Sequence, residues 1–121
     1  MNIEVRTSNN IQGSAKMIEY VRAQLNSEFS RYSERLTHIE VHFSDENAAK
    51  GGDQDKRCAI EVHAAGLKPL GVTHKAASVD LALDGAIEKL HHLFEHTIKR
   101  LDEREKHAER PNWDALAEQQ E

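Results

Sequence analysis

Histidine is the residue type in this chain with the clearest capacity to hold a metal ion. The chain has eight histidines, and His92 and His96 stand four residues apart, so a helix would place them on one face. His38, His42 and His63 would share one face of a sheet if their segments are strands. No carboxylate or cysteine stands at the spacing of an H-E-x-x-H zinc motif. We therefore expect no resident metal or cofactor, with His92 and His96 as the candidate pair if a metal is bound.

Residue types that are typical of catalytic sites form no known motif here. The sequence has no glycine-rich phosphate loop, paired-cysteine motif or nucleophile elbow. The single cysteine, Cys58, stands among apolar residues in an alternating segment, which is typical of a buried, unreactive thiol. The acidic segment 45–56 lacks the spacing and the terminal glutamate of a calcium loop. We expect a protein that is not an enzyme.

Basic residues form a second set of candidate functional residues, because they could bind phosphate groups. Arg22, Arg31 and Arg35 lie off the apolar stripe of the first predicted helix, where they fit either a solvated surface or a phosphate-binding one. The formal net charge is −5, and all of the excess lies in residues 79–121, because residues 1–78 contain ten basic and ten acidic residues. This balance argues against strong nonspecific attraction to polyphosphate.

Length and composition indicate one globular domain. A chain of 121 residues can bury a core without disulfides, and 38% hydrophobic with 31% charged residues is typical of a soluble protein. No apolar run approaches the roughly 20 residues that span a bilayer. Residues 1–5 already fit a strand, which leaves no room for a signal sequence. We expect a cytoplasmic protein that does not contact membranes.

Four predicted strands position the histidines. Apolar and polar residues alternate in segments 2–7, 37–44 and 57–64, as in strands with one buried face. Residues 70–77 form a fourth, weaker strand, in which small inward-facing residues would let a helix pack closely. The polar segment 45–56 has no apolar period and fits a mobile hairpin loop.

Two predicted helices position most of the basic residues. Ser14 can cap the first helix, whose apolar stripe runs from Ile18 to Leu36. Ser78 can cap the second, and Asp80 suits the positive end of its dipole. The stripe of this second helix holds Leu83, Ala86, Ile87, Leu90, Leu93, Phe94, Ile98 and Leu101. The opposite face holds Glu88, Lys89, His91, His92, Glu95, His96, Lys99 and Arg100.

The predicted order is β-α-β-β-β-α, which defines an α+β fold. Three strands joined by turns form an antiparallel meander, and the first strand joins the same sheet through the crossover helix. Both helices then pack on one face of a four-stranded sheet, and the other face is left to solvent or a partner. We expect this domain to span residues 1–105, with a charged, flexible tail over 106–121. In the tail, Trp113 either docks on the domain or a partner, or is disordered.

The run from Ala82 to Leu90, ALDGAIEKL, resembles the signature of the ribosome hibernation-promoting factor family, which includes ribosome-associated inhibitor A, also called protein Y. The Glu19-Tyr20-Val21 and Ala59-Ile60-Glu61-Val62 segments support the resemblance, which covers roughly residues 1–105. It implies a β-α-β-β-β-α fold similar to double-stranded-RNA-binding domains. It also implies a non-catalytic protein that binds the small ribosomal subunit in the channel for messenger and transfer RNA, and silences translation in stationary phase or stress.

The resemblance implies contact with ribosomal RNA by Lys89, which matches the helix lysine of the family, and by Arg100 and Arg22. The full set of expected phosphate contacts is Arg22, Arg31, Arg35, Lys75, Lys89, Lys99, Arg100 and Arg104. Because the sequence ends near residue 121, we expect it to be without the dimerisation domain of longer family members, and we expect a monomer that binds no DNA. Relatives carry several cations where this chain has His91, His92, Glu95 and His96. This difference, with the acidic charge, leaves open a protein-interaction module of the same fold without rRNA binding, and a histidine-based metal sensor.

Overall fold

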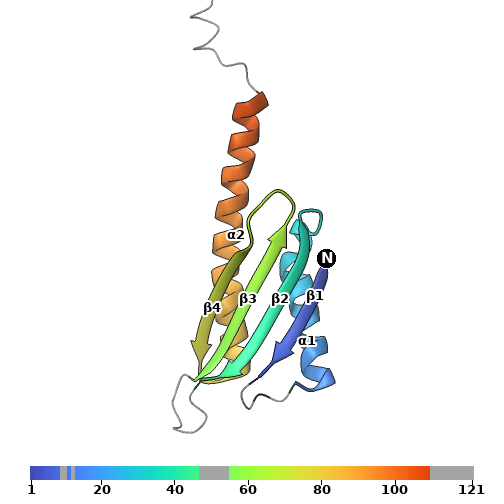
Figure 1. Ribbon diagram of the computed structural model, residues 1–121, viewed down its shortest axis with the longest axis vertical. Helices are drawn as coiled ribbons and strands as arrows, with labels where there is room; N and C mark the ends of the chain where they lie inside the picture. Colours follow the sequence, from blue (N-terminus) through green and yellow to red (C-terminus); the bar gives the residue numbers. More distant parts are fainter. Residues whose placement is uncertain (9–10, 12, 47–54, 110–121) are drawn as a thin grey trace, which may run out of the picture. The chain divides into compact units, whose positions relative to one another are not determined.

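The computed structural model describes residues 1–8, 11, 13–46 and 55–109, and within 101–109 it describes the helical backbone and the side chain of Glu103. Its elements are β1 (Asn2–Thr7), α1 (Ala15–Phe29), a 3₁₀ helix η1 (Ser30–Tyr32), β2 (Leu36–Asp45), β3 (Lys56–Ala64), β4 (Leu70–Ala76) and α2 (Val79–Glu109). The predicted β-α-β-β-β-α order and α+β class are confirmed (Figure 1). Most of the predicted hairpin loop and the segment around Trp113 lie outside the described residues.

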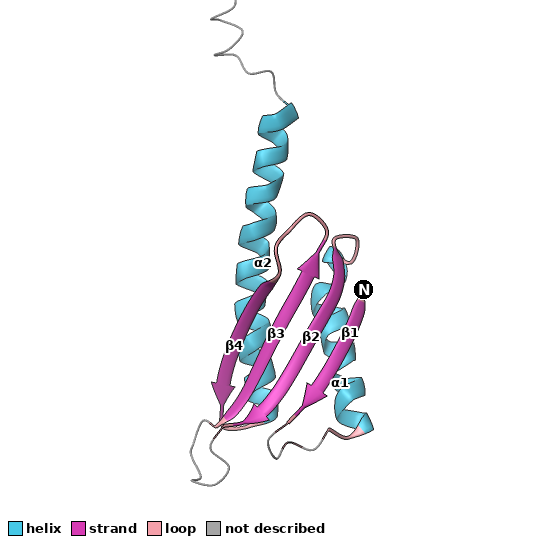
Figure 2. Cartoon of the chain, in the orientation of Figure 1, coloured by secondary structure: helices cyan, strands magenta, loops and turns pink. Residues whose placement is uncertain are grey.

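The four strands form one mixed sheet in the order β1-β2-β3-β4. β1 runs parallel to β2, because α1 carries the chain back across the sheet, whereas β2, β3 and β4 are antiparallel neighbours (Figure 2). The register pairs Ile39 with Ile3 on one side and with Val62 on the other. Since side chains alternate between faces, this register gathers the apolar residues of the strands on one face.

The chain divides into two compact units, Met1–His91 and His92–Glu121. In the first unit, α1 and the Val79–His91 part of α2 lie behind the sheet in Figure 1. The hydrophobic residues that are at most 5% exposed in this unit are Val21, Leu25, Phe29, Leu36, Ile39, Val41, Phe43, Cys58, Ile60, Val62, Ala82, Leu83, Ala86, Ile87 and Leu90. These residues come from both helices and the central strands, so one layer of apolar side chains joins helices and sheet. The predicted boundary near residue 105 stays a prediction.

Both predicted helix caps are confirmed. The Ser14 hydroxyl accepts a hydrogen bond from the Met17 amide at 3.1 Å, and the Ser78 hydroxyl accepts one from the Leu81 amide at 3.2 Å. Each bond satisfies an amide that has no partner within its helix. None of the described helices holds an apolar stretch long enough to span a membrane.

The prediction that the first helix continues to Leu36 is wrong. α1 ends at Phe29, and a 3₁₀ turn follows, in which the Ser33 amide donates to the Ser30 carbonyl at 3.1 Å. Leu36 is the first residue of β2 and is 3% exposed. The apolar pattern in the sequence continues past the end of α1 because Leu36 would be buried both in a helix and in a strand. The chain must turn here to bring β2 alongside β1.

The sequence predicts that the fourth strand turns small residues toward the helix, and among its inward residues only Ala76 is small, at 8% exposed. β4 turns Val72, His74 and Ala76 toward the helices, since these pair with the inward residues of β3. The helix also contributes a small residue: a Cβ atom at Gly85 would overlap the ring of His74. A glycine in mid-helix costs stability relative to alanine, so this contact explains its presence.

We predict that Gly85→Ala destabilises the fold by about 1–3 kcal/mol, although alanine favours helix by about 1 kcal/mol, because the new methyl group overlaps His74. Chemical denaturation measures the free energy of unfolding. Adding His74→Ala should restore part of the loss. Gly71→Ala is the matched control, since its Cβ would meet the Ile60 carbonyl oxygen at an ordinary 3.8 Å. A stabilising effect of Gly85→Ala alone would contradict the contact.

We predict that Cys58 is unreactive in the folded chain, because its side chain is fully buried and burial raises the pKa of its thiol to about 12. At pH 8 the thiolate should be about 1,000-fold rarer than in the unfolded chain. The folded state holds the Cys58 thiol proton more tightly than the unfolded state does. The contribution of this thiol to the free energy of unfolding is therefore complete below the pKa of the unfolded state, and it is lost as the pH rises through the pKa of the folded state. Disulfide-exchange reagents should modify the thiol only in denaturant, and rapid modification without denaturant would exclude this environment.

Candidate nucleic-acid interface

The eight basic residues expected at the RNA surface lie on three parts of the molecule. One group follows α1 and its 3₁₀ turn, a second surrounds β4, and a third belongs to the second compact unit. In the same order, the groups are Arg22, Arg31 and Arg35; Lys75 and Lys89; and Lys99, Arg100 and Arg104. Five of these residues therefore belong to the first compact unit and three to the second.

Lys89 is the residue of this set with the best-defined position. It is exposed on α2, and its Nζ donates a hydrogen bond to the Thr73 carbonyl oxygen of β4 at 2.9 Å. β4 is one of the two edge strands of the sheet, and some of its carbonyl groups have no neighbouring strand. The ammonium group has two further protons available for an anionic partner. The helix thus holds a cation at the sheet edge.

Lys75 adds a second cation to β4. It is exposed, stands two residues beyond Thr73, and pairs with Arg57 of β3 in the strand register. Arg57 is half-buried and its guanidinium lies 3.8 Å from a carboxylate oxygen of Glu46. Beside β4, Lys75 and Lys89 are therefore both exposed to a partner.

Arg22 occupies an exposed position on α1. It borders a shallow hollow of about 230 Å³, together with Asn26 and the first three residues of the chain. Among the described residues, Arg22 forms no ion pair. Its guanidinium can therefore engage a phosphate without first losing a carboxylate partner.

Arg31 and Arg35 are held by the turn after α1. The guanidinium carbon of Arg31 lies 4.8 Å from the ring centroid of Tyr32, a cation–π distance. Arg35 is half-buried, and its carbonyl oxygen accepts the Ala65 amide at 3.0 Å. Arg31 thus has a side-chain contact and Arg35 a backbone hydrogen bond near this turn.

The third group lies in the second unit. Lys99 and Arg100 are exposed on α2, whereas Arg104 belongs to the helical backbone but its side chain lies outside the described residues. His92 and His96 are exposed on the same helix. In the described part of the chain, no third histidine, cysteine or carboxylate joins this pair into a possible metal-binding group.

The placement of His91 on the exposed polar face is wrong. Its ring stacks on Phe29 of α1 with centroids 4.5 Å apart, and its Nε2 lies 2.8 Å from a carboxylate oxygen of Glu28. The side chain is 23% exposed. His91 therefore joins the two helices, and only His92, Glu95 and His96 of the four noncationic positions are exposed.

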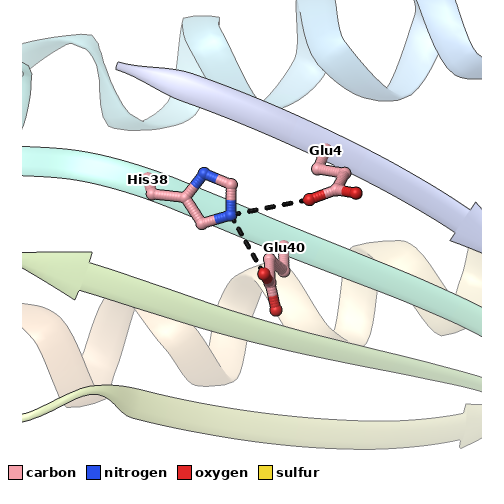
Figure 3. Close-up of side chains that lie close together, drawn as sticks. All are labelled: Glu4, His38 and Glu40. Atoms are coloured by element: carbon pink, nitrogen blue, oxygen red, sulfur yellow. Dashed lines mark hydrogen bonds and ion pairs between the residues drawn. The ribbon is translucent and has the colours of Figure 1, made fainter.

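Sequence reasoning missed a group of carboxylates beside the histidines of the open sheet face. His38 Nε2 lies 3.1 Å from Glu40 Oε1 and 3.8 Å from Glu4 Oε2 (Figure 3). On β3, His63 Nε2 lies 3.2 Å from Glu61 Oε1. Alternation in the sequence assigns these side chains to one face of the sheet. They meet because the strand register pairs Glu4 with Glu40 and Glu40 with Glu61.

The fold and these surfaces define a small α+β domain that offers exposed cationic side chains on its helices and edge strand, and a polar open sheet face. The profile of the family described as Sigma 54 modulation protein / S30EA ribosomal protein matches residues 4–106. This chain belongs to that family. The family resemblance inferred from the ALDGAIEKL run is therefore confirmed.

Solved structures agree with the family assignment. The crystal structure of the Thermus thermophilus Protein Y N-terminal domain is 25% identical, with a TM-score of 0.62, and the match covers 84% of this chain and 99% of that one. A ribosomal subunit interface protein from Coxiella burnetii is 13% identical, with a TM-score of 0.63, and covers 82% and 99% of the two chains, which shows a shared fold. Comparison with curated protein sequences gave no match.

We predict that His91→Ala destabilises the fold by about 1–2 kcal/mol, because it removes a ring stack and a hydrogen bond between the two helices. Thermal and denaturant unfolding measure the loss. His92→Ala is the matched control, because His92 is exposed and its replacement should change the free energy of unfolding by less than about 0.5 kcal/mol. Equal effects of the two substitutions would contradict the assigned role of His91.

Proposed function

We propose that this chain is a non-catalytic, ribosome-associated regulator of translation. In this proposal it binds the small ribosomal subunit in the channel used by messenger and transfer RNA, and it silences translation under stress or in stationary phase. The observation that carries the proposal is the family match over residues 4–106, which spans nearly the whole described domain. The fold shared with a ribosomal subunit interface protein supports the same class of partner.

The exposed cations supply the proposed contacts with ribosomal RNA. Lys89 and Lys75 would contact phosphates beside β4, and Arg22 would do so beside α1. Arg31 and Arg35, and in the second unit Lys99, Arg100 and Arg104, complete the proposed set. Such contacts position a protein on RNA without reading its sequence, which suits a surface made largely of lysine and arginine.

The negative net charge is compatible with this surface because binding depends on the local field. Some charges are paired within the domain, which leaves the net charge unchanged: Arg6 forms an ion pair with Glu4 at 2.7 Å, and Lys56 forms one with Asp45 at 2.8 Å. The bond to Glu4 raises the pKa of Arg6, and the bond to Asp45 raises the pKa of Lys56. A few phosphate contacts by cations elsewhere on the surface can favour binding locally, with an affinity that falls as salt rises.

The proposed inhibition is steric and electrostatic. A folded domain that occupies the channel excludes messenger and transfer RNA, and its cations take phosphate positions on ribosomal RNA. No bond in the nucleic acid needs to break, so the proposal requires no catalytic residue. Release would follow from competition for the same channel or from screening of the phosphate contacts.

We predict that the chain cosediments with purified small subunits, and that Lys75→Ala with Lys89→Ala weakens binding by on the order of 10-fold. The slope of log affinity against log salt concentration should become shallower by about 1 for each lost phosphate contact. Measurements at several salt concentrations give both quantities. Thermal melting of the variant checks that loss of the Lys89 hydrogen bond to Thr73 has left the domain folded.

The matched control is Lys16→Ala with Lys68→Ala, which removes two exposed lysines outside the proposed contact set. It should retain most of the affinity. Absence of binding at low salt would contradict the proposed function. Recovery of protein partners after nuclease treatment, with no ribosomal binding, would instead favour an interaction module of the same fold that has lost rRNA binding.

A further inference from the structure

The open face of the sheet brings two histidines and three glutamates together from β1, β2 and β3. Glu4, His38 and Glu40 form one group whose potential ligand atoms all lie within 4.8 Å of one another. Glu40, Glu61 and His63 form a second group that meets the same limit and shares Glu40 with the first. The rings of His38 and His63 are 5.7 Å apart between centroids and stand opposite each other in the register.

The atom spacing in the first group is close to that of a zinc coordination shell. Ligands about 2.0–2.2 Å from a tetrahedral zinc ion are roughly 3.3–3.6 Å from one another. His38 Nε2 lies 3.1 Å from Glu40 Oε1 and 3.8 Å from Glu4 Oε2, so these distances bracket that range (Figure 3). Small side-chain adjustments can therefore bring three donor atoms to one ion.

The charge of the cluster matches a divalent cation. Glu4, Glu40 and Glu61 contribute three negative charges when ionised, and the neighbouring Arg6 offsets one through its ion pair with Glu4. Arg6 contacts Oε1 of Glu4 through both Nε and a terminal nitrogen, which leaves Oε2 facing His38. With neutral imidazoles the cluster carries two negative charges, and one divalent ion would neutralise them.

The cluster is supported by strands and is open to an incoming ion. Each side chain comes from a paired residue of β1, β2 or β3, so the backbone fixes its starting point. Beside it lies a hollow of about 430 Å³, bordered by Glu40, Glu61 and Gly71 among others. Gly71 pairs with Glu61 and carries no side chain, which keeps this approach open.

We propose that Glu4, His38 and Glu40 bind one divalent transition-metal ion of the zinc class, with water completing its coordination. His63 and Glu61 form an adjoining set that contacts the same ion only secondarily through the shared Glu40. We place the ion in the first group because His38 is the less exposed histidine, at 24% against 38% for His63, and has two carboxylates near its Nε2. The imidazole nitrogen selects zinc over magnesium, which prefers oxygen ligands.

Isothermal titration of the untagged chain with Zn²⁺ tests the site. The expected result is one bound ion per chain, a loss of affinity on the order of 100-fold in His38→Gln, and a smaller loss in His63→Gln. Mg²⁺ at the same concentrations should give no comparable binding. Nitrogen NMR of the unmodified chain gives a readout that needs no variant, because Zn²⁺ should shift the His38 Nε2 signal first.

The matched control is His42→Gln, since His42 lies on the same face of β2 but its Nε2 bonds to the Ser8 hydroxyl at 2.7 Å. It should bind Zn²⁺ as the unmodified chain does. The proposal is overturned by absence of Zn²⁺ binding, by equal losses in His42→Gln and His38→Gln, or by loss only when His92 and His96 are replaced. Ribosome cosedimentation is a separate measurement, so either proposal can fail alone.

Discussion

The close approach of α2 to the edge of the sheet is the constraint on which the arrangement of this domain depends. Gly85 leaves room for the ring of His74, and Lys89, one helical turn later, donates to the carbonyl oxygen of Thr73. Gly85 and Lys89 lie one turn apart on α2, and they contact the adjacent residues His74 and Thr73 of β4. The Ala82–Leu90 segment that first indicated the family thus has a structural role: Gly85 permits the close approach, and that approach places Lys89 at the edge of the sheet.

The two faces of the sheet have different roles: one is buried under the helices and the other is open to a ligand. One face buries the apolar residues of β1, β2 and β3 under the helices, so it provides most of the driving force for folding. The other face keeps charged and imidazole side chains in contact with water, and their arrangement there is free to serve a ligand. The proposed ribosomal contacts use cations on the helices and on β4, whereas the proposed metal site uses the open face of β1 and β2. The net charge of −5 therefore describes the chain as a whole, whereas the proposed ribosomal contacts are cationic and the proposed metal site is anionic.

Much of the fold could be predicted because it depends on local patterns. Alternation in β1, β2 and β3 and the caps at Ser14 and Ser78 follow from neighbouring residues, and the structure confirms them. The errors arose where a residue serves two elements or faces an element distant in sequence. Leu36 continues a helical period but begins a strand. His91 fits a polar stripe, yet its partners are Phe29 and Glu28 on another helix.

The sequence by itself determined the order of elements, the apolar face of each and the family, because periodicity and a local motif carry that information. Tertiary structure alone decided which polar side chains meet. Glu4 reaches His38 because β1 pairs in parallel with β2, and Glu61 reaches Glu40 because β3 pairs from the other side. Alternation assigns a face but not a partner, since any even shift in register preserves the face and changes every neighbour. The same limit applies to Lys89, whose contact with Thr73 depends on how closely the helix packs.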